Sequence, residues 1–204
     1  MSKYEKCEQL ATETLENLIA SKDGWMSFLD TASRMYKYTF DEQILIHAQR
    51  PDARACAAFD FWTAESKMNR HIRRGAKGIA LIDRESHRLY YVYDAADTVA
   101  RANQKSKDPE DYIWKIKNGS EAAVNEVLGK NTGVSDQSLQ RSILTLASKT
   151  VQSRIAAYSH EFNLIYQKSS ADVVSPAMIK AFMDTVSASV AVMALKRSGF
   201  DTTA

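Results

Sequence analysis

The sequence predicts an α+β fold that is mostly helical, with a small antiparallel β-hairpin or sheet followed by a helical C-terminal part. Apolar residues recur at three- and four-residue steps over much of the 204-residue chain, as on amphipathic helices. Two short runs, 78–83 and 88–93, interrupt that pattern and are typical of strands. We expect residues 1–130 to form an α+β domain with an N-terminal helix, and residues 131–204 to form a helical region packed on it.

Three helices are expected before the first proline. Residues 3–20 carry apolar side chains near helical spacing, which predicts an amphipathic helix. A second apolar stripe consists of Trp25, Phe28, Leu29, Ala32 and Met35. Thr39 and Glu42 have the spacing of a capping box, which predicts that a third helix begins there and runs to Gln49. Pro51 stops it.

The next part of the chain is expected to carry a short helix and then the hairpin. Residues 56–69 predict the helix, with Phe59, Phe61 and Trp62 in the core. A polar turn over 84–87 joins the two strands. Residues 98–120 are polar and lack periodicity, so we expect a loop there.

The remainder is expected to be helical. Apolar residues from Leu139 to Ile165 fit one long helix or two with a kink. Ser175 and Pro176 have the residue types of an N-cap and a first helical position, and Gly199 those of a helix end. The apolar stripe of this last helix is expected to pack within the chain, although it could instead pair with another protein.

Composition indicates a soluble globular protein of the reducing cytoplasm. The content is 45% hydrophobic and 25% charged, and the net charge is only +2. We expect no membrane span, because no segment reaches ~20 apolar residues, and no secretory signal. Cys7 and Cys56 are far apart and form no Cys-x-x-Cys pair, so no disulfide framework is expected.

The strongest functional signal is a cationic segment with glycines just before the first strand. Its residues are Arg70, Arg73, Arg74, Gly75, Lys77 and Gly78. Glycine allows a sharp turn and close approach of the main chain, and arginine offers paired donors to phosphate oxygens. The segment therefore predicts a contact with a phosphate backbone. An ordinary solvated loop is the competing interpretation.

The strands add further candidates for this surface. Arg84 and Arg88 extend the local positive charge. Tyr90 is expected to be exposed, with Tyr91 and Tyr93 on the opposite face of the strand in the core. An exposed aromatic ring beside cations suits a single-stranded nucleic acid, because bases stack on it.

These motifs together resemble the N-terminal domain of the ArdC antirestriction family. The likeness is closer to the related domain that opens large helicase-methylase proteins on clostridial conjugative elements. It covers roughly residues 24–100 and is carried by Asp41–Ala53, Trp62 and Ile72–Ile82. In that family the domain is described as binding single-stranded DNA, so the resemblance implies the same ligand here.

No catalytic or cofactor motif stands out, and we expect a protein that is not an enzyme and needs no cofactor or metal. A His-Glu-x-x-His pair is missing, so the metallopeptidase-like activity of full-length ArdC-type proteins is not carried over. The carboxylates Asp83, Glu85, Asp94 and Asp97 could hold a metal for nuclease chemistry, but carboxylates are common at turns and strand ends.

Two functions are therefore expected as alternatives. In the first, the protein binds single-stranded DNA of a mobile element during conjugation and counters host defence, as antirestriction proteins do. In the second, it is a stoichiometric inhibitor that binds a host nuclease directly, either a restriction enzyme or a CRISPR Cas effector (an anti-CRISPR protein). A domain cut from a larger helicase-methylase is a further interpretation of the same chain.

Overall fold

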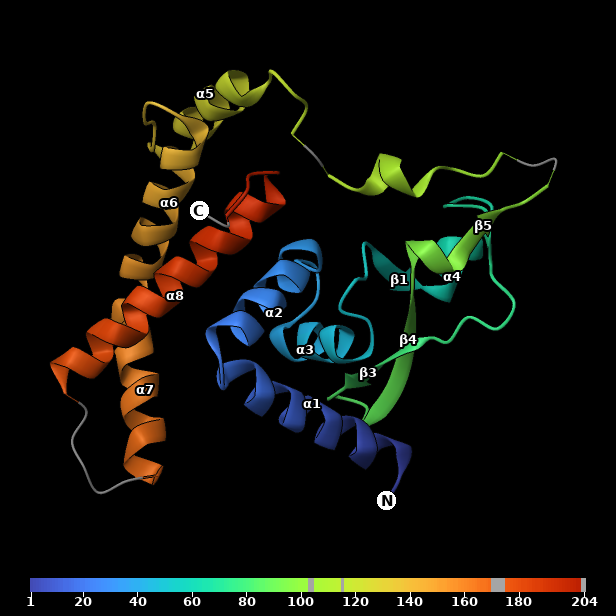
Figure 1. Ribbon diagram of the computed structural model, residues 1–204, viewed down its shortest axis with the longest axis horizontal. Helices are drawn as coiled ribbons and strands as arrows, with labels where there is room; N and C mark the ends of the chain where they lie inside the picture. The colour runs from blue at the N-terminus through green and yellow to red at the C-terminus, as the bar shows by residue number, and fades with distance from the viewer. Residues whose placement is uncertain (103–104, 115, 170–174, 203–204) are drawn as a thin grey trace. The chain divides into compact units, whose positions relative to one another are not determined.

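The fold is seen in a computed structural model, which describes residues 1–102, 105–114, 116–169 and 175–202. The chain forms two compact units, Met1–Trp114 and Lys115–Ala204. The predicted fold class is confirmed: the chain is mostly helical, with small antiparallel sheets and a helical C-terminal part (Figure 1).

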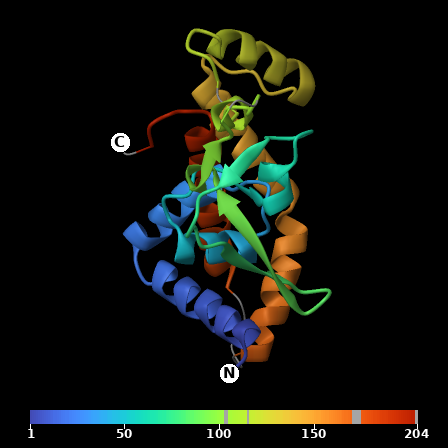
Figure 2. The ribbon, with the colours of Figure 1, turned by 90° about the vertical axis from the view of Figure 1, so that its right-hand side faces the viewer.

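Unit 1 begins with three helices, α1 (Lys3–Ile19), α2 (Lys22–Arg34) and α3 (Phe40–Gln49). A capping box of Ser2 and Glu5 opens α1, and the predicted box of Thr39 and Glu42 opens α3. These caps satisfy backbone N–H groups that the first turn of a helix leaves without partners. Figures 1 and 2 show the helices beside the hairpin, where α1 and α3 both pack on its first strand.

The strands form two antiparallel sheets. Their bounds are β1 (Cys56–Ala58), β2 (Arg70–Ile72), β3 (Ile79–Asp83), β4 (Arg88–Asp94) and β5 (Thr98–Ala100). The three-stranded sheet has the order β1-β4-β3, and β2 pairs with β5. The predicted hairpin is confirmed as β3–β4, with Leu81 opposite Tyr90 and Ala80 opposite Tyr91.

Two parts of the sequence-based prediction are wrong. Residues 56–69 are not one helix, because β1 pairs with β4 and only α4 (Phe59–Thr63) is helical. Residues 98–120 are not all loop, because the chain there begins with β5 and later forms the 3₁₀ helix η2 (Pro109–Tyr112). The strands involved are three residues long, too short for an alternating pattern to be visible in the sequence.

The core of unit 1 lies between the helices and the hairpin. It includes Cys7 from α1, Leu45 and Ile46 from α3, and Leu81 and Val92 from the sheet. Trp62 is buried as predicted, and its Nε1 donates to the backbone oxygen of Tyr93 at 2.9 Å. Phe59 was expected in the core as well, but its side chain is exposed.

Unit 2 consists of α5 (Glu121–Thr132), α6 (Leu139–Ser153), α7 (Ile155–Ser169) and α8 (Pro176–Arg197). The apolar run that began at Leu139 is thus two helices, which separate at Arg154. Ser175 caps α8 as predicted, and Gly199 follows it with φ +85°. α6 and α8 pack on each other, which is the main contact of this unit.

The last helix also has the length and composition of a membrane-spanning segment. α8 has 22 residues, a mean hydropathy of 1.5 in its most apolar window, and little of that window is buried. A single helix of this kind is weak support for a membrane span, because helices of soluble proteins can have the same length and composition.

Candidate nucleic-acid interface

The cationic segment forms a hydrogen-bonded turn between β2 and β3. The backbone N–H of Ala76 donates to the oxygen of Arg73 at 3.0 Å, and Gly75 has φ +86°. A glycine suits this place because a side chain would strain a backbone with positive φ. The N–H of Arg73 donates to the backbone oxygen of Asp97 at 2.7 Å, which fastens the turn to the rest of unit 1.

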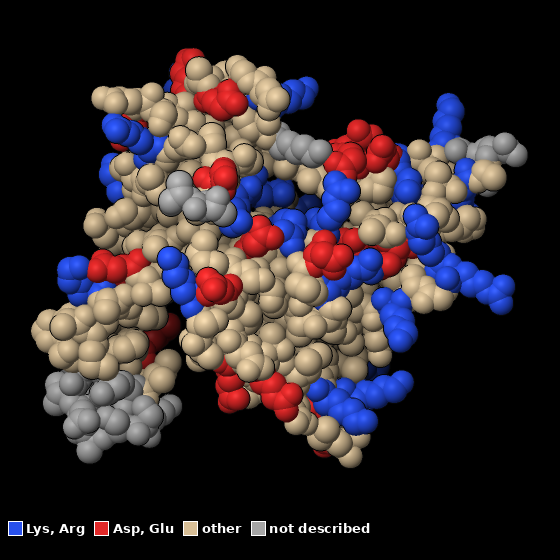
Figure 3. Space-filling view, viewed as in Figure 1, with Lys and Arg blue, Asp and Glu red and all other residues tan. Residues whose placement is uncertain are grey.

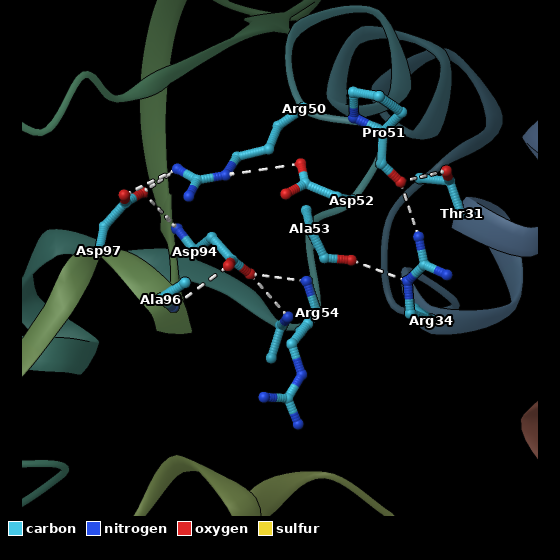
Figure 4. Close-up of polar contacts among 11 residues, drawn as sticks. Thr31, Arg34, Arg50, Pro51, Asp52, Ala53, Arg54, Asp94, Ala96 and Asp97 are labelled. Atoms are coloured by element: carbon cyan, nitrogen blue, oxygen red, sulfur yellow. Dashed lines mark hydrogen bonds and ion pairs between the residues drawn. The ribbon is translucent and has the colours of Figure 1, made fainter.

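The turn is bonded to the backbone at Asp97, and a network of two buried carboxylates, Asp94 and Asp97, holds this part of the chain (Figure 4). The Arg50 guanidinium donates to both carboxylate oxygens of Asp97, at 2.7 and 2.6 Å. Asp94 accepts from the backbone N–H groups of Arg54 and Ala55 at 2.8 and 2.9 Å. Paired and hydrogen-bonded charges of this kind fix geometry, because a buried carboxylate without partners is costly.

Three cations of the turn take no part, through their side chains, in the hydrogen bonds of Asp94 and Asp97 described above. Arg73, Arg74 and Lys77 are exposed, and none forms an ion pair with a carboxylate in the described part of the chain. Figure 3 shows Lys and Arg side chains projecting from the part of unit 1 that lies away from α1, α2 and α3. Free guanidinium and ammonium groups remain available to phosphate oxygens.

The remaining arginines proposed from the sequence have other partners or positions. Arg70 donates to the hydroxyl of Thr98 at 2.7 Å and to the backbone oxygen of Lys107 at 3.1 Å. Arg84 pairs with Asp41. Arg88 is exposed, but it lies opposite Asp83 at the far end of the hairpin, about 17 Å from the turn by strand rise. The turn therefore keeps only three of the proposed cations.

The prediction for the tyrosines of β4 is wrong in its choice of face. Tyr90 lies against the core, and its hydroxyl donates to a carboxylate oxygen of Glu42. Burial beside that carboxylate raises the pKa of Tyr90. Tyr91 is the exposed neighbour, with 45% of its surface accessible, and Tyr93 is half-buried on the same face. Tyr91 thus replaces Tyr90 as the candidate for base stacking.

Gly78 brings these tyrosines against the end of the turn. A Cβ at this position would lie 3.1 Å from Cβ of Tyr91 and 3.2 Å from Cζ of Tyr93. The backbone of Gly78 has no positive φ, so its role is close approach and not turn formation, in contrast to Gly75. Lys77 directly precedes Gly78, so the turn's cations and the two rings lie near the same end of β3.

An aromatic patch continues this surface. It consists of Phe59, Tyr91 and Tyr93; the ring centroids of Phe59 and Tyr93 are 6.2 Å apart, and the ring planes are inclined at 67°. Phe59 is 51% exposed. The sequence offered Phe59 only as a core residue, since an apolar ring in a short helix is usually buried. An exposed aromatic patch next to free cations can stack bases while the cations bind the phosphates.

Other arginines near the sheet serve the fold. Arg34 donates to the backbone oxygens of Ala53 and Pro51 at 2.8 and 2.7 Å, as Figure 4 shows, and also pairs with Asp30. Arg54 pairs with Glu110. These contacts tie the segment after α3 to its neighbours, so Arg34 and Arg54 differ from the cations of the turn, which form no ion pair in the described part of the chain.

The carboxylates considered for metal binding do not converge. Asp94 and Asp97 take part in the network above, and Asp83 accepts hydrogen bonds from Ser86 at 2.6 Å and from Glu85 N–H at 3.0 Å. Among the described residues, no group of three His, Cys, Asp or Glu side chains could hold a metal ion. Burial raises the pKa of the Cys56 thiol to about 12, so this cysteine is a poor nucleophile at neutral pH.

Comparison with known proteins gives no relative from which a function could be transferred: no family model, curated protein or solved structure matches the chain.

Proposed function

We propose that unit 1 binds single-stranded DNA through the turn of Arg73, Arg74 and Lys77 together with the aromatic patch. The observation that carries the proposal is the close approach of Gly78 to Tyr91 and Tyr93, which places the end of the cationic turn beside the exposed ring of Tyr91 and the half-buried ring of Tyr93. Stacking is worth ~1–3 kcal/mol per base and does not depend on sequence. Binding is therefore expected to tolerate many sequences.

The biological role that follows is protection of a mobile element during transfer. Transferred DNA enters a recipient as a single strand, and a protein of the ArdC type that covers it would counter host restriction. Binding without catalysis makes the action stoichiometric. The residues that support this proposal are those of the turn and the patch, and no metal or cofactor is needed for it.

The experiment is a titration of a fluorescent single-stranded oligonucleotide at several salt concentrations, with wild type and Arg73→Ala/Arg74→Ala. Each phosphate contact on a single strand contributes about −0.7 to the slope of log K against log salt, so three cations predict a slope of about −2. The double variant should bind more weakly on all sequences, with a slope shallower by about 1.4.

A matched control is Lys3→Ala/Lys6→Ala, which removes the same charge from exposed positions on α1. α1 lies near the hairpin end of the sheet, since Tyr4 contacts His87 there, while the turn precedes the other end of β3. Equal losses in both double variants would mean that only net charge matters. Unchanged binding in Arg73→Ala/Arg74→Ala would remove the turn from the interface.

The competing function uses the same cations against an acidic protein surface. If the wild-type protein binds no single strand at low salt but co-elutes with a restriction enzyme or a Cas nuclease free of nucleic acid, the direct inhibitor is the correct account.

A further inference from the structure

Unit 1 has a groove at the hairpin end of β3, away from the cationic turn. Its volume is about 970 Å³, and it runs between α1, α3 and the end of the hairpin. The groove is within the size range of sites that hold several ligand groups at once, ~300–1,000 Å³. It is formed entirely by unit 1, so its geometry does not depend on unit 2.

The floor of the groove is apolar. It consists of Ala11 and Leu15 of α1, Ile44 and Leu45 of α3, and Ile82 of β3. On α1 the lining positions are 8, 11, 12 and 15, which form one stripe of about two turns, or ~10 Å. An elongated apolar floor of this length fits the side chains of a short peptide segment.

The rim of the groove is acidic. Its carboxylates are Glu8, Asp41, Glu42, Asp83 and Glu85. Among the described residues, Arg84, which pairs with Asp41, is the one cation that lines it. Hydrogen bonds from Ser86 hold the pKa of the Asp83 carboxyl below its ordinary value, so this group is charged at neutral pH. The rim thus carries a strong negative charge in a protein whose net charge is positive.

We infer that this groove binds a basic amphipathic segment of a partner protein, with apolar side chains on the floor and Lys or Arg side chains at the rim. Charge complementarity selects the occupant: an acidic peptide or a nucleic acid would be repelled by the rim. A helix that presents apolar residues three and four positions apart is a common occupant of such grooves.

The cationic turn of a second copy is a poorer occupant. It consists of Arg73, Arg74 and Lys77, and the intervening residues are Gly75 and Ala76. That turn has no large apolar side chain to fill the floor. The inference is independent of the proposed function, because the groove and the turn lie at opposite ends of β3.

The test uses the whole protein and a short fluorescent peptide of Leu and Lys with an amphipathic helical pattern. A peptide with Glu in place of each Lys is its control. The Lys peptide should bind the wild type, and the Glu peptide should not. Glu8→Lys/Glu85→Lys should weaken binding about tenfold at low salt, because two attractions become repulsions worth ~0.2–1 kcal/mol each.

Two further variants decide how that result is interpreted. Glu13→Lys/Glu16→Lys makes the same charge change at exposed positions of α1 outside the groove, and should weaken binding no more than about twofold. Thr12→Trp places a bulky side chain at an exposed lining position without changing charge, and should abolish binding. Circular dichroism checks that each variant is folded.

Three outcomes would overturn the inference. The first is peptide binding that survives both Glu8→Lys/Glu85→Lys and Thr12→Trp. The second is an equal loss in the groove variant and the α1 control, which would show attraction to net charge alone. The third is a wild-type dimer, seen by sedimentation velocity, that dissociates in the groove variant, because the occupant would then be a second copy.

Discussion

At the residue scale, Tyr90 and Tyr91 show how two identical neighbours on one strand take different roles. Tyr90 faces α3, where its hydroxyl donates to Glu42, while Tyr91 faces solvent beside Gly78. The sequence alone could not assign the faces, because β3 is apolar at both alternating sets of positions, Ile79 and Leu81 on one face and Ala80 and Ile82 on the other. Only the packing of the helices decides which face is covered.

This assignment makes opposite predictions for the two side chains. Tyr91→Ala should weaken single-strand binding by about 5- to 150-fold, the equivalent of ~1–3 kcal/mol, with little change in the free energy of unfolding. Tyr90→Phe should leave DNA binding intact but lower stability by about 1 kcal/mol, since it removes a hydrogen bond to a carboxylate. Anisotropy titration and urea unfolding of both variants measure the two effects. A DNA-binding loss in Tyr90→Phe alone would restore the original assignment.

At the scale of elements, signals between neighbouring residues predicted the helices, whereas the sheets depend on pairing between segments far apart in the chain. Two helix starts could be predicted from residues within one helical turn, and both are confirmed. They are the capping box of Thr39 and Glu42 and the N-cap and first position at Ser175 and Pro176. The β2–β5 sheet pairs two strands of three residues each, with Arg70 opposite Ala100. Segments this short carry no periodic pattern that the sequence could reveal. The same applies to Arg70 itself: its partners Thr98 and Lys107 are distant in sequence, so its structural role could not be foreseen.

The ion pair between Arg50 and Asp97 connects α3 to the segment that holds the cationic turn of the proposed interface. Asp97 ends the 3₁₀ helix η1 (Ala95–Asp97), and its backbone oxygen receives the N–H of Arg73. Asp97→Asn should destabilise unit 1 by roughly 2–3 kcal/mol, because it leaves the partly buried guanidinium of Arg50 without its charged partner. It should also weaken DNA binding by loosening the turn.

Asp52→Asn is the matched control for that prediction. Asp52 is 3.9 Å from Arg50, but its side chain is 83% exposed, so its loss should change the free energy of unfolding by less than about 0.5 kcal/mol. Urea unfolding of both variants gives the comparison. Equal changes in the free energy of unfolding would show that the buried pair stabilises the protein no more than the exposed one.

At the scale of the whole molecule, unit 1 separates two kinds of surface along one strand. Free cations precede β3 and the rings of Tyr91 and Tyr93 lie beside its first half, whereas the acidic groove lies at its other end. The opposite charges of the two surfaces nearly cancel in the net charge of +2, so composition could not reveal that they are separated. Unit 2 is a helical assembly in which α6 and α8 pack together, and its α7 leaves Leu164 and Ile165 exposed.

The stability of the protein should fall as pH drops from about 7 to 5, and His47 should be one cause. Its Nδ1 lies 2.8 Å from the hydroxyl of Thr31, and burial lowers its pKa below the ordinary value of 6.5. The unfolded chain therefore binds this proton more readily, so the free energy of unfolding decreases as pH falls through that range. The pH profile should be flatter in His47→Gln and unchanged in His71→Gln, an exposed site. Parallel profiles of wild type and His47→Gln would contradict this.

The measurement that tests the central claim most directly is the affinity of the wild-type protein for a labelled single strand and for the same sequence as a duplex, by fluorescence anisotropy at low and moderate salt. The account predicts tighter binding to the single strand, since Phe59, Tyr91 and Tyr93 can stack only on bases that are not paired, and an affinity that falls steeply with salt. Equal affinity for both forms, or no binding at low salt, would contradict it.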